Sequence, residues 1–342
     1  MSARECIIPV FVPHLGCPHD CVFCNQRRIS GSEAPATAAT VIQAIEQSAA
    51  LSHSGAKRQL AFYGGSFTAI EASRQEELLG AAAAAIACRE IDSIRLSTRP
   101  DAIDGTVLAR LKRYGVETVE LGAQSMDEEV LRLSGRGHTA EDVIKAAEAV
   151  KAAGFRLVLQ MMTGLPGDSA EKDVETAKRL IALRPDGVRI YPTVIVRDTA
   201  LYELWRAGKY REHTVEDAVA VCARLVPLFE EAGVPIIRLG LNPTEELSSG
   251  AAVAGAYHPA LGELVKARVM RHKAQELLRG IEPGSTVTLG VRAEELSQMI
   301  GQKRENISAL CQALSLADLK VRSCAAEKGE IVILSVEKSG KV

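Results

Sequence analysis

Short apolar runs alternate with longer amphipathic segments from residue 7 to about residue 241. The runs have the length of β-strands. The segments between them carry apolar residues three and four positions apart, as at Val143, Ala147 and Val150, which is the period of an α-helix. Repeated strand–helix units predict a parallel sheet, because parallel neighbours need a crossover connection. The predicted strands are residues 7–12, 59–63, 93–97, 118–121, 156–161, 188–194 and 235–241.

The segments between these strands predict helices, and glycine follows several of them, as at Gly115, Gly154 and Gly233. Glycine is common just beyond a helix because it readily adopts the left-handed conformation that ends one. Six or seven units are too few for an obvious closed eight-stranded barrel. The predicted fold class is therefore α/β, with a partial, open barrel of the (β/α)6 type. The predicted helices are residues 38–51, 74–88, 105–114, 140–153, 172–183 and 215–231.

Polar or glycine-rich motifs follow the predicted strands at the point where each strand ends. Each motif alone is a weak signal, because such residues are ordinary in turns. In open α/β folds, however, the carboxyl ends of parallel strands meet at one edge, and ligands bind there. The joint placement predicts one site at that edge. The motifs are the segment 17–24, Gly64-Gly65, Ser97-Thr98-Arg99, Gln124-Ser125 and Tyr191-Pro192-Thr193.

The segment after the first strand holds Cys17, Cys21 and Cys24 in a Cys-x3-Cys-x2-Cys pattern. Thiolates suit iron–sulfur clusters, zinc and copper(I). Closed protein metal sites usually need four ligands, whereas a 4Fe–4S cluster held by three cysteines leaves one iron open to a small molecule. Two alternatives stay open at this point: a zinc site completed by His14 or His19, and unremarkable thiols.

The spacing, with Phe23 just before the last cysteine, is the pattern of the radical S-adenosylmethionine (SAM) superfamily. Within it, residues 7 to 265 resemble the radical SAM domain of the Elongator catalytic subunit family, which modifies wobble uridines of tRNA. Residues 124–125 with 135–139 also resemble oxygen-independent coproporphyrinogen oxidases, but the Tyr-Pro-Thr and Leu-Tyr-Glu-Leu-Trp segments favour the Elongator branch. The segments that carry the resemblance are residues 135–139, 154–155, 161–167, 190–197 and 201–205.

The resemblance implies two cofactors, a 4Fe–4S cluster and SAM. Cys17, Cys21 and Cys24 would hold the cluster, whose open iron chelates SAM. An electron from an external donor would then cleave SAM to a 5′-deoxyadenosyl radical. Phe23 would pack near the cluster and shield it from water.

Other site residues follow from the same resemblance. Gly64 and Gly65 would bind the amino group of SAM, because a missing Cβ lets the backbone approach a ligand closely. Ser97, Arg99 and Gln124 would hold the ribose and the carboxylate, and Tyr191 would stack on or bond the adenine. Arg99 could instead pair with Asp101 or Glu120, and Tyr191 could be a core aromatic.

Three parts are predicted: a barrel over residues 1–245, a connecting loop and helix over 246–281, and a small α+β domain over 282–342. The last part reads strand–helix–helix–strand–strand and is similar to a KH domain, whose Gly-x-x-Gly loop clamps a nucleic-acid backbone. Gly301, Lys303 and Arg304 are its candidate RNA-binding residues, although Arg304 replaces the second glycine. The alternative is a helical hairpin turn with two solvated charges.

The Elongator family carries an acetyltransferase domain after the radical domain. The residues after 260 are too few for one and lack its glycine signature. We therefore expect a different co-substrate, a borrowed partner or other chemistry.

The formal net charge of −2 gives no global attraction to nucleic acid, so any RNA contact needs local basic patches. The eight cysteines show no disulfide framework, and free thiols fit a reducing compartment. The first residues lack a signal-peptide pattern, and no apolar run reaches the ~18 residues of a membrane span. We expect a cytoplasmic protein without a membrane partner.

Three functions are compatible with these residues. The first is a radical SAM enzyme that modifies RNA, with tRNA as the expected partner. The second is a radical SAM enzyme that acts on a small molecule. The third is a non-catalytic iron–sulfur or RNA-binding accessory protein, which the intact cysteine set and Gly64-Gly65 disfavour. Basic residues at the barrel mouth would indicate RNA, whereas an enclosed apolar mouth would indicate a small molecule.

Overall fold

The computed structural model describes residues 5–12, 17, 21–25, 35–49, 56–242 and 250–338. The chain divides into two compact units, and the division falls inside helix α9 (Val215–Glu231). The first unit comprises Met1–Thr214 with Leu228–Tyr257, and the second comprises Val215–Pro227 with His258–Val342. The predicted domain boundaries at residues 245 and 281 stay predictions.

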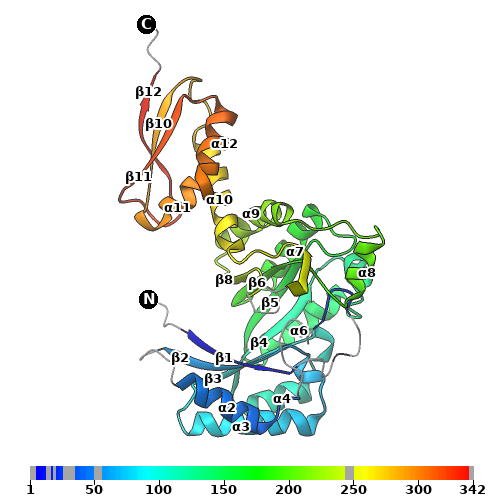
Figure 1. Ribbon diagram of the computed structural model, residues 1–342. Helices are drawn as coiled ribbons and strands as arrows, with labels where there is room; N and C mark the ends of the chain where they lie inside the picture. The colour runs from blue at the N-terminus through cyan, green and yellow to red at the C-terminus, as the bar shows by residue number, and fades with distance from the viewer. Residues whose placement is uncertain are drawn as a thin grey trace. The chain divides into compact units, whose positions relative to one another are not determined.

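The first unit is built on a parallel sheet, which has seven strands within the described residues (Figure 1). Neighbours in the sheet follow the order of the chain, and β1 and β8 form opposite edges, so the sheet stays open. The predicted partial barrel is confirmed. In sheet order the strands are β1 (Glu5–Phe11), β2 (Lys57–Tyr63), β3 (Ser93–Thr98), β4 (Val116–Gln124), β5 (Arg156–Thr163), β6 (Gly187–Pro192) and β8 (Ile236–Leu239).

Helices connect these strands, and their apolar faces are buried. In α6, Val143, Ala147 and Val150 are all buried, as their spacing predicts. Two short helices and an antiparallel pair of strands, β7 (Val194–Val196) with β9 (Ala252–Gly255), add to the predicted elements. The short helices are α5 (Glu128–Leu133) and α8 (Ala200–Arg206). The longer ones are α2 (Ala38–Ala49), α3 (Ala72–Ala87), α4 (Gly105–Arg113), α6 (Ala140–Ala152), α7 (Ala170–Ala182) and α9.

Polar residues start many of these helices directly after the strand-end loops. At α6, the Thr139 hydroxyl accepts from the Asp142 N–H at 3.2 Å, and the Asp142 carboxylate accepts from the Thr139 N–H at 2.8 Å. Such reciprocal caps satisfy backbone donors that a helix start leaves unpaired. Asp104, Asp127, Ser169 and Thr199 cap α4, α5, α7 and α8 in one direction only, with a side-chain oxygen that accepts from a backbone N–H.

The second unit carries helix α10 and a small mixed sheet in the order β11-β10-β12. Strand β10 is parallel to β11 and antiparallel to β12. Apolar side chains such as Met270, Val287, Leu289 and Leu319 form its core. The elements follow the predicted order: α10 (Leu261–Leu277), β10 (Thr286–Val291), α11 (Leu296–Ile300), α12 (Glu305–Leu314), β11 (Asp318–Ser323) and β12 (Val332–Glu337).

Among the described residues, no helix is long and apolar enough to cross a membrane.

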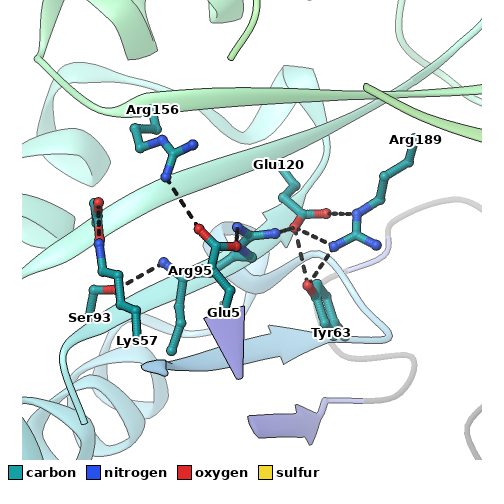
Figure 2. Close-up of polar contacts among 10 residues, drawn as sticks. Glu5, Lys57, Tyr63, Ser93, Arg95, Glu120, Arg156 and Arg189 are labelled. Carbon is teal, nitrogen blue, oxygen red and sulfur yellow. Dashed lines mark hydrogen bonds and ion pairs between the residues drawn. The ribbon is translucent and has the colours of Figure 1, made fainter. Parts of the chain in front are cut away.

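A buried carboxylate cross-links four strands of the first unit (Figure 2). Glu120 of β4, only 2% exposed, accepts hydrogen bonds from Arg95 Nη1 of β3 at 3.0 Å and from Arg189 Nε of β6 at 2.8 Å. The Tyr63 hydroxyl at the end of β2 donates to the same carboxylate at 3.1 Å, and Arg189 Nη2 donates to Tyr63 at 2.9 Å. Glu5 of β1 extends the network, 3.6 Å from Arg95.

Burial of a carboxylate costs free energy unless both oxygens find charged partners. Both oxygens of Glu120 accept from Arg189, and one also accepts from Arg95. Burial and the charge of Glu120 raise the pKa of Tyr63, so its hydroxyl stays protonated and able to donate. The network therefore holds the end of β2, where Gly64-Gly65 begins, against β4 and β6.

We expect Glu120→Gln to reduce the free energy of unfolding by about 3–5 kcal/mol. The change leaves the buried Arg189 without a carboxylate partner among the described residues, and it leaves Arg95 with only the more distant Glu5. Glu117→Gln is a matched control on the same strand: Glu117 pairs with Lys57 at 2.7 Å, but its side chain is 32% exposed. Glu117→Gln should reduce the free energy of unfolding by less than about 1 kcal/mol. Urea unfolding of both variants measures the difference, and equal losses would contradict the prediction.

Candidate functional site

The cysteine segment lies beyond β1, and main-chain hydrogen bonds fix its second half. The Val22 N–H donates to the Ser134 carbonyl at 3.1 Å, and the Val22 carbonyl accepts from the Leu201 N–H at 2.7 Å. The Cys24 N–H donates to the Cys21 carbonyl at 3.0 Å, which closes a turn between the two thiols. His14 and His19, the alternative zinc ligands, lie outside the described residues.

Two of the thiols are linked through neighbouring side chains to two other strands, β4 and β2. Cys21 is buried, and Arg136 Nη1 donates to its Sγ at 3.2 Å. Arg136 Nη2 donates to the Gly122 carbonyl of β4 at 2.8 Å. Cys17 is exposed, and its Sγ lies 3.4 Å from the Ser66 hydroxyl, just beyond β2. Side chains far apart in the chain thus meet at the carboxyl ends of the strands.

The predicted glycine turn directly follows Tyr63. Gly64 has φ of +98°, a conformation that side chains rarely adopt, so glycine is required at that position. The turn is anchored by Ser66 and Phe67, which are buried. The predicted Ser97 lies on the neighbouring strand, where its hydroxyl is 3.5 Å from the Phe62 carbonyl.

Gln124 ends β4 in an unusual conformation. Its φ is +65°, a bulge interrupts the pairing of β4 with β5 between Gly122 and Gln124, and its side chain is buried. Gln160 Nε2 donates to Gln124 Oε1 at 3.2 Å. A left-handed residue other than glycine costs free energy and persists only where its surroundings hold it, which is common at ligand sites. The strain supports a functional position for Gln124.

Arg99 is brought to the same edge but is already paired. Its Nε and Nη2 each lie 2.9 Å from a carboxylate oxygen of Asp101, and Nη2 also donates to the Arg136 carbonyl. This is the ion pair that the sequence left open as an alternative. A role of Arg99 toward the carboxylate of SAM stays a prediction.

Arg136 is the residue that sequence reasoning missed. It lies in the segment 135–139, which served only as a mark of resemblance. The only available signal was an arginine between two glycines, and that pattern does not reveal a partner 115 residues away.

The two aromatic residues of the predicted site pack on one apolar cluster. Phe23 and Tyr191 both contact the buried cluster of Val130, Met162 and Leu165. The Tyr191 hydroxyl lies 3.5 Å from Arg189 Nη1, which links it to the buried network of Figure 2. Burial raises the pKa of Tyr191, so its hydroxyl is a neutral donor.

Comparison with known families decides the class of this fold and site. The chain matches the Radical SAM superfamily over residues 11–180 and the Radical_SAM C-terminal domain over residues 185–271. The chain belongs to the radical SAM superfamily.

The curated relatives of this radical SAM protein include Elongator proteins. Elongator complex protein 3 of Homo sapiens is 35% identical over 179 residues, which are 52% of this chain and 32% of that protein. A tRNA uridine(34) acetyltransferase of Methanocaldococcus infernus is 32% identical over 197 residues, 52% of this chain and 37% of that protein. The match thus spans about a third of these relatives' length, and it confirms the predicted resemblance.

A solved structure supports the fold. The archaeal Elp3 of Methanocaldococcus infernus, with an N-terminal deletion, superposes with a TM-score of 0.64 at 24% identity. The similarity covers 84% of this chain and 71% of that one. Because only 24% of the residues are identical, this similarity shows a shared fold and nothing about function.

Membership of the superfamily implies a 4Fe–4S cluster and SAM, and the described residues fit an anionic cluster. They contain no group of three or more His, Cys, Asp or Glu side chains converging as around a single metal ion. Cysteines of a 4Fe–4S cluster bind different irons, so their sulfurs need not converge on one point. Buried guanidinium nitrogens of Arg99 (Nη1) and Arg136 (Nε) have no partner in the described part of the chain. Such donors beside thiolates suit an anionic group.

We expect the buried ring of His138 to make the free energy of unfolding depend on pH. Burial and the nearby Arg136 lower its pKa from 6.5 to about 4, so the neutral ring donates from Nε2 to the Ala123 carbonyl at 3.2 Å. An unfolded histidine takes up a proton below its ordinary pKa of about 6.5, whereas the folded one stays neutral until about 4. Its contribution to stability is therefore complete above pH 6.5 and is lost as the pH falls toward 4.

We expect the wild type to lose about 2–3 kcal/mol more unfolding free energy between pH 7 and 4.5 than His138→Gln loses over that range. His272→Gln is the control, because His272 is exposed and should change this pH dependence less. Urea unfolding at the two pH values measures the effect. The prediction is wrong if both variants keep the pH dependence of the wild type.

Proposed function

We propose that this protein is a radical SAM enzyme that modifies RNA, with tRNA as the expected substrate. It would cleave SAM reductively at a 4Fe–4S cluster held by Cys17, Cys21 and Cys24, using an electron from an external donor. The observation that carries the proposal is the match to proteins named Elongator complex protein 3 and tRNA uridine(34) acetyltransferase. That match supports a shared type of substrate.

The cluster and SAM, when bound, would supply the radical, and the protein would supply orientation and exclusion of water. Gly64-Gly65 would let the backbone approach the SAM amino group closely, because glycine has no Cβ. The charge of Arg136 faces Cys21. Phe23 and Tyr191, which pack on the buried apolar cluster that includes Met162, would shield the site from water and so limit quenching of a radical.

A basic and aromatic segment beside the cysteine loop favours RNA over an enclosed small molecule. Helix α8 is tied to this loop through the hydrogen bond between Leu201 and Val22. Its Tyr202 and Trp205 rings lie 6.1 Å apart, and the Arg206 guanidinium is 5.7 Å from the centre of the Tyr202 ring. Arg206 is exposed, as is Lys209 just after the helix. Aromatic faces stack on unpaired bases and cations contact phosphates.

The loop between α11 and α12 supports the KH-like interpretation. Lys303 and Arg304 are exposed and have φ of +49° and +64°. Arg304 therefore adopts the left-handed conformation that glycine would adopt most easily at that position. Asn306 holds the loop, because its Nδ2 lies 2.8 Å from the Ala267 carbonyl and 3.0 Å from that of Gln298. Gly301, Lys303 and Arg304 are proposed to contact the RNA backbone.

The co-substrate need not be that of the relatives, because the match spans about a third of their length.

The deciding assay is SAM cleavage by the anaerobically reconstituted, reduced protein, measured as 5′-deoxyadenosine with and without bulk tRNA. We expect tRNA to raise the turnover. Cys21→Ala is the control and should lose the cluster and the cleavage, because a site of three cysteines has no spare ligand. Turnover indifferent to tRNA would favour a small-molecule substrate. A loaded cluster without SAM cleavage would contradict the enzymatic proposal.

A double variant tests the KH-like loop. Lys303→Ala with Arg304→Ala should weaken tRNA binding and reduce the slope of log affinity against log salt by ~1.4, because two phosphate contacts are lost. Cleavage of SAM without tRNA should not change. The control is Arg279→Ala with Lys328→Ala, which removes the same charge from other exposed positions. An unchanged affinity and salt slope in the first variant would remove the loop from the RNA-binding surface.

A further inference from the structure

Arg136 lies at the junction of the cysteine loop and β4. Its side chain is only 7% exposed. One terminal nitrogen donates to Cys21 Sγ at 3.2 Å and the other to the Gly122 carbonyl at 2.8 Å. The third nitrogen, Nε, is buried without a partner among the described residues. A single guanidinium thus joins a predicted cluster ligand to the strand that ends in Gln124.

The main chain around Arg136 is held from two sides. Its N–H donates to the Leu131 carbonyl at 3.1 Å, and its carbonyl accepts from Arg99, which is itself paired with Asp101. Gly135 and Gly137 on either side have positive φ values, +64° and +75°. The turn geometry and the two backbone contacts direct the side chain toward Cys21.

The fit against β4 leaves no space for a larger residue. A Cβ on Gly122 would lie 2.9 Å from Gln124 Nε2 and 3.3 Å from Arg136 Nη2. Glycine at this position therefore lets the guanidinium lie against the strand. Cys21, Arg136 and Gln124 are consequently packed as neighbours at the edge where the cofactors are expected.

The charge of Arg136 is not neutralised by the protein in the described part of the chain. The neighbouring Arg99 has its own carboxylate, because Asp101 takes two of its donors. No ion pair joins Arg136 to an acidic side chain in the regions that the structure describes, and its nearest polar partners are a sulfur and a carbonyl. A buried positive charge facing a thiol is stabilised when that thiol becomes an anionic ligand.

We propose that Arg136 is a positioning residue that holds Cys21 in place as a ligand and raises the reduction potential of the cluster bound there. The proposal rests on the proposed function, because it assumes the 4Fe–4S cluster. Reduction adds negative charge to the cluster, and a fixed cation in a buried site makes that addition more favourable. Hydrogen bonds to the ligating sulfur act in the same direction.

The test compares Arg136→Gln, Arg136→Lys and the control Arg132→Gln after anaerobic reconstitution. Arg132 lies four residues earlier and is exposed, so its variant removes the same charge from the surface. Iron and sulfide content reports loading, and a redox titration followed by electron paramagnetic resonance reports the midpoint potential. Neither readout uses SAM or RNA.

Arg136→Gln should shift the midpoint to a more negative value by at least the equivalent of a tenfold change in the reduction equilibrium, about 59 mV for one electron. Arg136→Lys keeps the charge but cannot reach both partners, so its potential should lie between those of the wild type and Arg136→Gln. Arg132→Gln should match the wild type. A fully loaded Arg136→Gln with the wild-type potential would overturn the proposal.

A variant that folds but binds no cluster also tests the proposal. If Arg136→Gln folds but takes up no cluster, Arg136→Lys decides between the two parts of the proposal. A loaded Lys variant supports the role of the charge. An empty one supports the positioning of Cys21 by a guanidinium that reaches both partners, and it overturns the part played by the charge. A wild-type protein that binds no cluster would overturn the proposed function and this proposal together. A loaded wild type with unaltered potentials in the variants would overturn only the role of Arg136.

Discussion

The structure of the first unit depends on one buried carboxylate. Glu120 lies on the fourth strand of an open sheet and accepts from Arg95 and Arg189 on strands to either side. An open parallel sheet has no closing strand to fix its curvature, so contacts between side chains of different strands must do so. Because Tyr63 and Tyr191 join the same network, the contacts that hold the strands also set the position of the site.

The candidate site is assembled from segments that begin where the strands end. The second half of the cysteine loop is held by the main chain of Ser134 and Leu201 as well as by its own turn between Cys21 and Cys24. Gly64, Gln124 and Arg136 reach the same edge from β2, β4 and the turn before α6. The backbone of Gln124 is strained, and one buried nitrogen each of Arg99 and Arg136 finds no partner among the residues that the structure describes. A bound anionic cofactor would offset these costs.

Much of this organisation could be predicted before the structure was known. The positions of the strands and long helices followed from period and caps, because burial of one face imposes the spacing of apolar residues locally. The cysteine pattern indicated a cluster, because ligand spacing in a short loop is also a local property. The short elements α5, α8 and the pair β7–β9 were not predicted, because they are stabilised by packing rather than by a long periodic pattern.

The sequence by itself determined the alternation of strands and helices, the three cysteines and the glycine turn, since each depends on residues close together in the chain. Only the tertiary structure decided what lies against them. Arg99 was a candidate for SAM, and folding pairs it with Asp101. The two glycines around Arg136 revealed no partner, and folding brings it to Cys21 across 115 residues. The contact between Arg136 and Cys21 depends on how several strands and loops meet, and no local pattern encodes that geometry.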